Sequence, residues 1–416
     1  MTLLTVWFVA VLLCLVHFLA ALPWLAALDR DLFGALARRP AAWGWALLGV
    51  LGAGAALAAF LLLVQAGERL ENWGRLYGAA LQAQLTADLI VGALALVLRY
   101  WRRGGAVALA AFREGVRQPL FWLFVGLGTL LLAVFLALPY FTFGDDYKMM
   151  KQVDHDVIML VAAAFGVIAA GLSISEEIEG RTAVTLMSKP VSRRQFLLGK
   201  YVGILLAALA LTGILAWFFQ WSVYFKPLLD WYGAANDPLQ AQFQPALTGL
   251  ARSVAPEETA GSFVRGVALW FADGLACLPG LLIGFGQVMV LVAIAAALAT
   301  RLPLPVTMLA CLLLYFLGHL APVLVQTAET LQMHYAAEHQ GQASGALQLV
   351  QFIAQLVDTV VPALEYFNLG PAIVRDRPLP LGEYLIYVGA VLANALLYTA
   401  IALLFGLILF EDRDLA

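Results

Sequence analysis

The sequence predicts an all-α polytopic membrane protein with about nine transmembrane helices. Hydrophobic residues make up 63% of the 416 positions, charged residues only 12%, and the mean hydropathy is +0.88. Such a chain has too little polar surface to cover the outside of a water-soluble domain. The hydrophobic residues are also gathered into stretches of the length, about 20 residues, that crosses a bilayer as a helix.

Charge and cysteine content exclude several classes of function. A net charge of -3 and an isoelectric point near 6.0 give no reason to expect nucleic acid as a partner. The cysteines, Cys14, Cys277 and Cys311, lie in or beside apolar runs without CxxC spacing, so we expect neither disulfides nor a zinc site. Cys14 and His17 are one helical turn apart, but a buried cysteine usually serves as a small hydrophobic residue, and no metal site is predicted.

The thickness of the bilayer sets the length expected of each span. The first lacks a basic leader and exceeds a signal-peptide core, so we expect it to be retained as a helix. The third is the shortest, and it carries Asp88. The nine predicted spans are residues 3–27, 44–66, 84–98, 120–141, 157–174, 201–224, 279–299, 304–325 and 384–409.

Basic residues predict the orientation, because short cytoplasmic loops are enriched in lysine and arginine. An amino terminus outside and a carboxyl terminus in the cytoplasm puts 15 of the 24 lysines and arginines in the cytoplasmic loops. Those residues are Arg30, Arg38, Arg39, Arg99, Arg102, Arg103, Arg113, Arg117, Arg181, Lys189, Arg193, Arg194, Lys200, Arg301 and Arg413.

Two parts follow from this map. Residues 1–104 are predicted as a three-helix module that ends in RYWRRGG, where the paired glycines permit a turn. Residues 105–416 are predicted as a core of six spans.

An amphipathic helix is predicted at residues 106–118, before the fourth span. Arg113 and Arg117 share one face, opposite Val107, Leu109 and Val116, which suits a helix in the headgroup plane. Pro119 then ends the helix. A short cytoplasmic linker is the alternative interpretation.

The most charged stretch is residues 175–203, in a segment (173–200) between two apolar spans. Gly180 is a plausible helix terminator, and Pro190 ends a short helix. Ser192 and Gln195 have capping-box spacing, so a helix should begin at Arg193 and continue through Lys200 into the sixth span. We expect a span, a short helix, a break, a short amphipathic helix, a turn and a span.

Several motifs occur in an order that resembles the type-2 ATP-binding-cassette (ABC) permeases. They are Glu176-Glu177, Gly180-Arg181-Thr182, the run from Leu186 to Arg193, Gly199-Lys200, and the run from Val361 to Asn368 before the last span. The subgroup to which the chain is similar comprises the stand-alone permeases of nitrous-oxide-reductase maturation and gliding-motility transporters. The resemblance covers residues 105–416.

The resemblance implies a six-helix exporter permease with an interfacial elbow helix at 106–118 and a cytoplasmic coupling loop at 173–200. It implies a homodimer in the bacterial cytoplasmic (inner) membrane, paired with separate ATPase subunits. The residues implied to receive the ATPase are Glu176, Glu177, Glu179, Gly180, Arg181, Thr182, Pro190, Ser192 and Arg193.

The chain itself is not expected to be an enzyme. It has no GxxxxGK[ST] phosphate loop, and Gly199-Lys200 is followed by Tyr201. ATP and Mg²⁺ should therefore be bound by the partner, and no cofactor by this chain.

Polar groups inside the membrane are candidates for function because burying a charge in lipid is costly. Asp88 and Asp273 are the two we single out. For Asp273 the alternative is helix capping or interfacial solvation. Asp88 could pair with a neighbouring helix, and its alternative is a shifted short span that places it near the outer surface. Residues 345–371 are too broken to span and are predicted as an outer re-entrant or interfacial helix pair. Residues 266–280 are expected to behave in the same way, with a break at Pro279-Gly280.

Three alternatives to a transporter permease remain open at this stage. A secondary transporter should carry paired charges at mid-membrane and internal symmetry, and neither is evident. A membrane enzyme should gather His, Asp or Glu near one bilayer face, whereas the five histidines are scattered. A membrane anchor that recruits an ABC ATPase to an envelope process would need the same coupling loop. The sequence carries no motif that specifies a substrate.

Overall fold

Every regular element of the computed structural model is a helix, throughout the residues that it describes: 2–64, 67–140, 145–179, 191–229, 238–338, 345–360, 362, 364–368 and 381–411. In that part of the chain, nine helices are long and apolar enough to cross a membrane, one at each predicted span. The predicted all-α polytopic class is confirmed.

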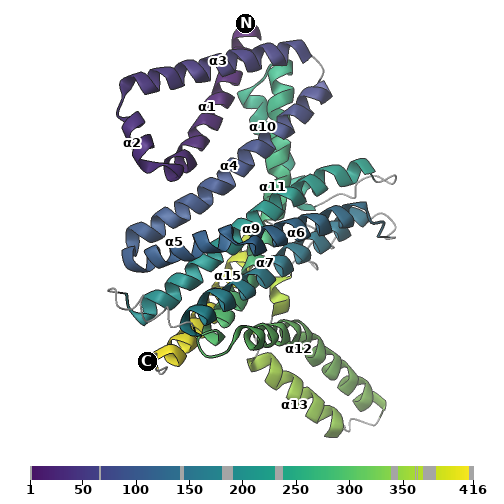
Figure 1. Cartoon of the computed structure of the whole chain (residues 1–416). Coiled ribbons are helices and arrows are strands. Elements are labelled where there is room, and N and C mark those ends of the chain that lie inside the picture. The colour runs from purple at the N-terminus through teal and green to yellow at the C-terminus, as the bar shows by residue number, and fades with distance from the viewer. Residues whose placement is uncertain are drawn as a thin grey trace.

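The elements follow one another with short connections (Figure 1). Their bounds are α1 Thr2–Leu28, α2 Arg30–Ala37, α3 Pro40–Val64, α4 Gly67–Tyr100, α5 Arg102–Arg117, α6 Pro119–Ala137, α7 Asp146–Glu179, α9 Arg193–Leu229, α10 Pro238–Val254, α11 Glu258–Leu298, α12 Leu304–Glu338, α13 Gly345–Val360, the 3-10 helix η1 Leu364–Phe367 and α15 Leu381–Glu411.

The core is built around α7, α9 and α11, whose side chains dominate the largest buried cluster together with those of α15. Small residues permit this packing: Ala162, Ala208 and Ala296 are fully buried. Large apolar side chains on α3, α12 and α15 point outward instead, as expected for surfaces that face lipid.

Close glycine contacts hold α4 against α11. A Cβ at Gly74 would overlap the carbonyl of Phe263, and a Cβ at Gly266 would overlap the carbonyl of Glu71. The first helices therefore pack on the rest of the chain through backbone-to-backbone contact, with a second buried cluster formed by α1, α3, α4 and the start of α11.

Several predicted boundaries were wrong. The third span is not a short helix over 84–98, because α4 runs for 34 residues. No break occurs at Pro279-Gly280: α11 continues through Pro279 over 41 residues, with Pro279 and Gly280 themselves buried. The span and the short helix expected before Gly180 are one continuous helix, α7.

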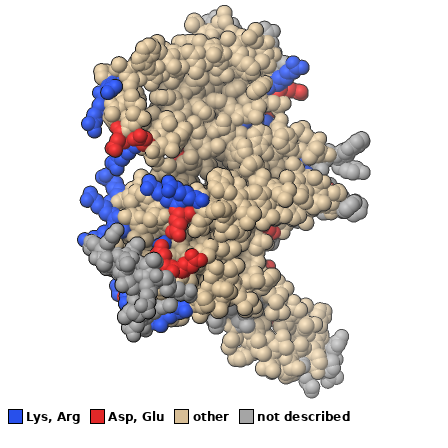
Figure 2. All heavy atoms as spheres, in the orientation of Figure 1, with Lys and Arg blue, Asp and Glu red and all other residues tan. Residues whose placement is uncertain are grey.

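Charged side chains gather along one edge of the molecule. Of the lysine and arginine atoms visible in Figure 2, most lie at the left, where α2, the junction of α4 and α5 and the carboxyl-terminal end of α15 lie in Figure 1. We call this edge the basic side, and it is defined by those helix ends and by the first turn of α9, which carries Arg193 and Arg194. The other end of the helices is called the opposite side.

The hairpin of α12 and α13 projects from the core at the lower right of Figure 1. The predicted helix pair at 345–371 corresponds to α13, which packs on α12, and to η1, which packs against α11 and α12. Leu364 and Phe367 of η1 are buried, so this turn is anchored in the core.

Candidate functional site

The two helices that flank the predicted coupling loop both end on the basic side. The first, α7, ends at Glu179, and the second, α9, begins at Arg193. Gly180, Arg181, Thr182 and Pro190 lie outside the described residues. The site is therefore built here from the helix ends on either side of them.

The start of α9 carries the capping box that the sequence predicted. The backbone N–H of Gln195 donates to Ser192 Oγ at 3.2 Å, and the backbone N–H of Ser192 donates to Gln195 Oε1 at 3.2 Å. This reciprocal pair satisfies two N–H groups that the first turn of a helix leaves without partners. The entry of the chain into α9 is thereby fixed.

A buried lysine lies about two turns after the start of α9. Lys200 is 4% exposed, and its ammonium donates to Glu177 Oε1 at 2.5 Å, Ser173 Oγ at 2.8 Å and Glu114 Oε2 at 3.3 Å. Ser173 also donates to Glu114 Oε2 at 3.3 Å. We call Glu114, Ser173, Glu177 and Lys200 the lysine cluster.

The lysine cluster joins three elements. Glu114 comes from α5, Ser173 and Glu177 from the end of α7, and Lys200 from α9. An ammonium has three N–H donors, and here each has an acceptor, which is what a charge needs if it is to be buried. The two helix ends that flank residues 180–190 are thus tied to each other and to α5.

The helix α5 occupies the range predicted for the interfacial elbow and lies along the first turns of α9. A Cβ at Gly199 would lie 2.7 Å from the carbonyl oxygen of Gly104, and a Cβ at Gly203 would overlap the carbonyl of Ala108. The buried face of α5 is a stripe of small residues and not its valine and leucine positions, because glycine and alanine allow the closer approach. Arg113 and Arg117 are exposed, as expected of a polar face. The position of α5 relative to the headgroup plane stays a prediction.

Arginines of the basic side cap the end of α15. Arg193 donates from Nη1 to the carbonyl oxygens of Phe410 and Glu411, both at 2.8 Å, and Arg301 donates from Nε to Leu409 O at 2.8 Å. The last carbonyls of a helix lack partners within it and carry the negative end of its dipole, so cations are favoured there. These contacts attach the last helix to the start of α9.

The turn between α11 and α12 is attached to α7 in a similar way. Ser175 donates to Ala299 O at 3.2 Å and to Leu302 O at 3.0 Å, and Ser175 is 3% exposed. Residues 173–177 of α7 therefore contact α5, α9 and the α11–α12 turn. Five helix ends meet in this one region.

The other predicted coupling residues are distributed around this region. Glu177 belongs to the lysine cluster, Arg193 caps α15, Ser192 caps α9, and Glu176 is exposed. Glu179 is the last residue of α7.

Asp273 and Asp88 do not join this site. Asp273, on α11, accepts hydrogen bonds from Arg75 Nη1 at 3.2 Å, Gln240 Nε2 at 3.2 Å and Gln244 Nε2 at 3.1 Å. Its carboxylate thus connects α4, α10 and α11. Asp88, on α4, is half-buried beside Trp24 of α1. Asp88 thus lies in a contact within the first four helices, and Asp273 in a contact between α4 and the later helices α10 and α11.

The sequence did not predict that Glu114, Ser173 and Lys200 lie together. It also did not predict that Arg75 pairs with Asp273. The available signal was Lys200 itself, a lysine at the apolar start of a span that needs a buried partner. Its partners are 23 and 86 residues away, so only the packing of α5 against α9 identifies them. Within the described ranges, no group of three or more His, Cys, Asp or Glu side chains is arranged to hold a metal ion.

Comparison with known families gives one match. Residues 106–415 match the model of the ABC-2 family transporter protein. The match begins in α5 and includes every element of the site described above. No curated protein matches the chain.

Proposed function

Because the chain belongs to the ABC-2 family of transporter proteins, and so is a permease subunit that partners an ABC ATPase, we propose that ATP hydrolysis is coupled through residues 173–200. In this proposal the ATPase subunit binds ATP and Mg²⁺, and this chain binds neither and catalyses no reaction. The observation that carries the proposal is the lysine cluster, which ties both ends of the coupling loop to a third helix.

The mechanism follows from how forces reach the helices. A push on residues 180–190 acts on the ends of α7 and α9, which share the Lys200 ammonium. Since Glu114 is held by the same ammonium, α5 would move with them. Ser175 and Arg193 extend the contacts to the α11–α12 turn and to α15. A small displacement at the ATPase would then shift several membrane helices together, as bistable packed interfaces allow.

We propose further that the basic side faces the cytoplasm, with the amino terminus outside, in the cytoplasmic (inner) membrane of a bacterium. The support is the concentration of lysine and arginine along that edge (Figure 2). By the same family argument, two copies of the chain would assemble with two ATPase subunits, and the direction of transport would be export.

The test is affinity purification of the tagged chain from mild detergent, with ATP hydrolysis measured on the purified material. We expect a nucleotide-binding protein to co-purify with the native chain. We expect Glu177→Lys to abolish this association, because two lysines then face each other at the buried position.

The matched control is Glu258→Lys, the same charge change at an exposed position in the first turn of α11. The other end of α11 adjoins Ser175, so Glu258 lies on the opposite side, about 60 Å away along the helix. The control should keep its ATPase. If no nucleotide-binding protein associates with the native chain, or if both variants behave alike, coupling through residues 173–200 is refuted. If an ATPase associates but reconstituted vesicles show no transport, the anchor alternative replaces the exporter.

A further inference from the structure

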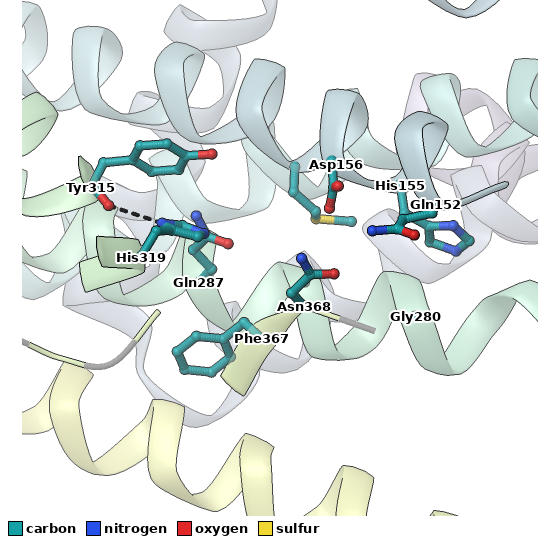
Figure 3. A pocket seen from close by; sticks show the side chains of 11 residues that line it. Gln152, His155, Asp156, Gly280, Gln287, Tyr315, His319, Phe367 and Asn368 are labelled. Carbon is teal, nitrogen blue, oxygen red and sulfur yellow. Dashed lines mark hydrogen bonds between the residues drawn. The ribbon is translucent and has the colours of Figure 1, made fainter. Parts of the chain in front are cut away.

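A polar pocket lies near the opposite side, away from the coupling site. It has a volume of about 140 Å³ and is enclosed by α7, α11, α12 and η1. Figure 3 shows Gln152 and Asp156 projecting from α7 toward Asn368, with Gln287, His319 and Tyr315 on the far wall. Nothing in the proposed coupling mechanism uses these side chains.

The pocket carries one negative charge among neutral polar groups. Asp156 is exposed, and among the described residues no lysine or arginine forms an ion pair with it. His319 donates from Nδ1 to the carbonyl oxygen of Tyr315 at 2.9 Å, which leaves Nε2 of the neutral ring as an acceptor. The amide groups of Gln287 and Asn368 also line the pocket, and each contains an oxygen that can accept a hydrogen bond. This chemistry fits a cation that donates hydrogen bonds.

The aromatic neighbours agree with a cation. His155 also lines the pocket, with Nδ1 2.5 Å from Lys151 O and Nε2 3.3 Å from Cys277 O, and a neutral ring donates to one of these carbonyls. The rings of Tyr315 and Phe367 line the same pocket, and aromatic faces attract cations.

An apolar groove continues from this pocket. It has a volume of about 600 Å³ and lies between α7 and α12, with Tyr315 lining both the pocket and the groove. Every other side chain that lines it is apolar or a cysteine, including Leu160, Ile168, Leu312 and Phe316. The groove therefore suits hydrocarbon.

The lengths match one leaflet of a bilayer. Asp156 and Ile168 are 12 residues apart on α7, or about 18 Å along the helix. One leaflet is half of a hydrocarbon core that is about 30 Å thick, so its thickness is similar to this length. The apolar run of α7 begins directly after Asp156, so this carboxylate lies where headgroups meet acyl chains. An exposed carboxylate at that depth is costly without a partner, and a cationic headgroup would supply one.

We propose that the pocket and groove together bind an amphiphile from the bilayer, with an amine head at Asp156 and its chain along α7 and α12. The proposal is independent of the ATPase, because it concerns binding by the chain alone.

The experiment uses the purified chain in phosphatidylglycerol nanodiscs, which supply no amine head. The probes are a long-chain primary amine with a photoreactive diazirine in its alkyl chain, and the matched fatty acid and fatty alcohol. We expect the amine to label the peptides that contain residues 160–168 and 308–316, well above the other two probes.

Two variants make the result specific. Asp156→Asn should lower labelling by the amine roughly tenfold, the loss expected for one charge-assisted hydrogen bond. Its control is Glu329→Gln, which removes a carboxylate of the same α12 hairpin outside the pocket. Leu312→Trp should block labelling by filling the groove, whereas Leu320→Trp, also an exposed α12 position but outside the groove, should not.

Three outcomes would overturn the proposal. The first is equal labelling of the groove by all three probes. The second is amine labelling that Asp156→Asn leaves unchanged. The third is an unlabelled groove together with new cross-links between copies through Leu312→Cys, which would assign the groove to a second copy of the chain.

Discussion

The contact between Lys200 and Glu177 should be strongly coupled in a double-mutant cycle. The variants are Lys200→Met, Glu177→Gln and the pair together, and the free energy of unfolding is measured for each by detergent titration. Breaking a buried ion pair costs about 3–5 kcal/mol when the charge left behind stays buried. Here the side chain of Lys200 is 5% exposed and that of Glu177 is 27% exposed.

The exposure of Glu177 reduces the expected value. Once Lys200 is removed, water reaches Glu177 in part, so solvent screening offsets some of the loss. Ser173 and Glu114 remain as partners when Glu177 alone is changed. We therefore expect a coupling energy of about 1–3 kcal/mol, in the range of hydrogen bonds to charged groups.

The matched control is the ion pair between Arg194 and Glu411. Its atoms are 2.9 Å apart, yet the two side chains are 69% and 49% exposed. Exposed pairs contribute about 0–1 kcal/mol, so Arg194→Met with Glu411→Gln should be nearly additive. The reasoning is refuted if the Lys200 cycle is additive, or if the control pair couples as strongly.

Three further predictions concern packing, the cap and the Asp273 contact, each measured as a shift in the free energy of unfolding. Gly203→Ala should cost about 1–3 kcal/mol, because its Cβ overlaps the carbonyl of Ala108, while Gly49→Ala has open space and should not destabilise. Ser192→Ala should cost about 1 kcal/mol by removing the helix cap. Asp273→Asn should cost about 1–3 kcal/mol, because Arg75 then loses the nearer of its two charged partners and keeps only Glu71.

The positions of the membrane helices were predictable because they depend on local composition. A helix needs about 20 apolar residues to cross the bilayer, and that requirement is visible in any single stretch. The capping box at Ser192 and Gln195 was predictable for the same reason, since its parts are three residues apart. The predicted positions of the helix ends were less accurate. The helices α4 and α11 continue into polar or proline-containing sequence, because buried neighbours stabilise them there.

The lysine cluster was not predictable from local sequence. Glu114 and Lys200 meet only because Gly199 and Gly203 let α5 lie against α9. The sequence does not say which helix a glycine in a predicted span packs against. Only the register between the two helices, which are distant in sequence, decides this. The same limit applies to Asp156, whose surroundings come from α11, α12 and η1.

The glycine contacts and the lysine cluster have one mechanical consequence in common. Contact between the backbones of α5 and α9 at Gly199 and Gly203 leaves little room for one helix to shift relative to the other. At the basic end of the same contact, one ammonium holds both helices to α7. Helices joined in both ways are expected to move as one body, since densely packed interfaces respond in discrete steps and not by continuous deformation. A single cation is therefore placed where its loss would separate the movement of the coupling loop from that of α5.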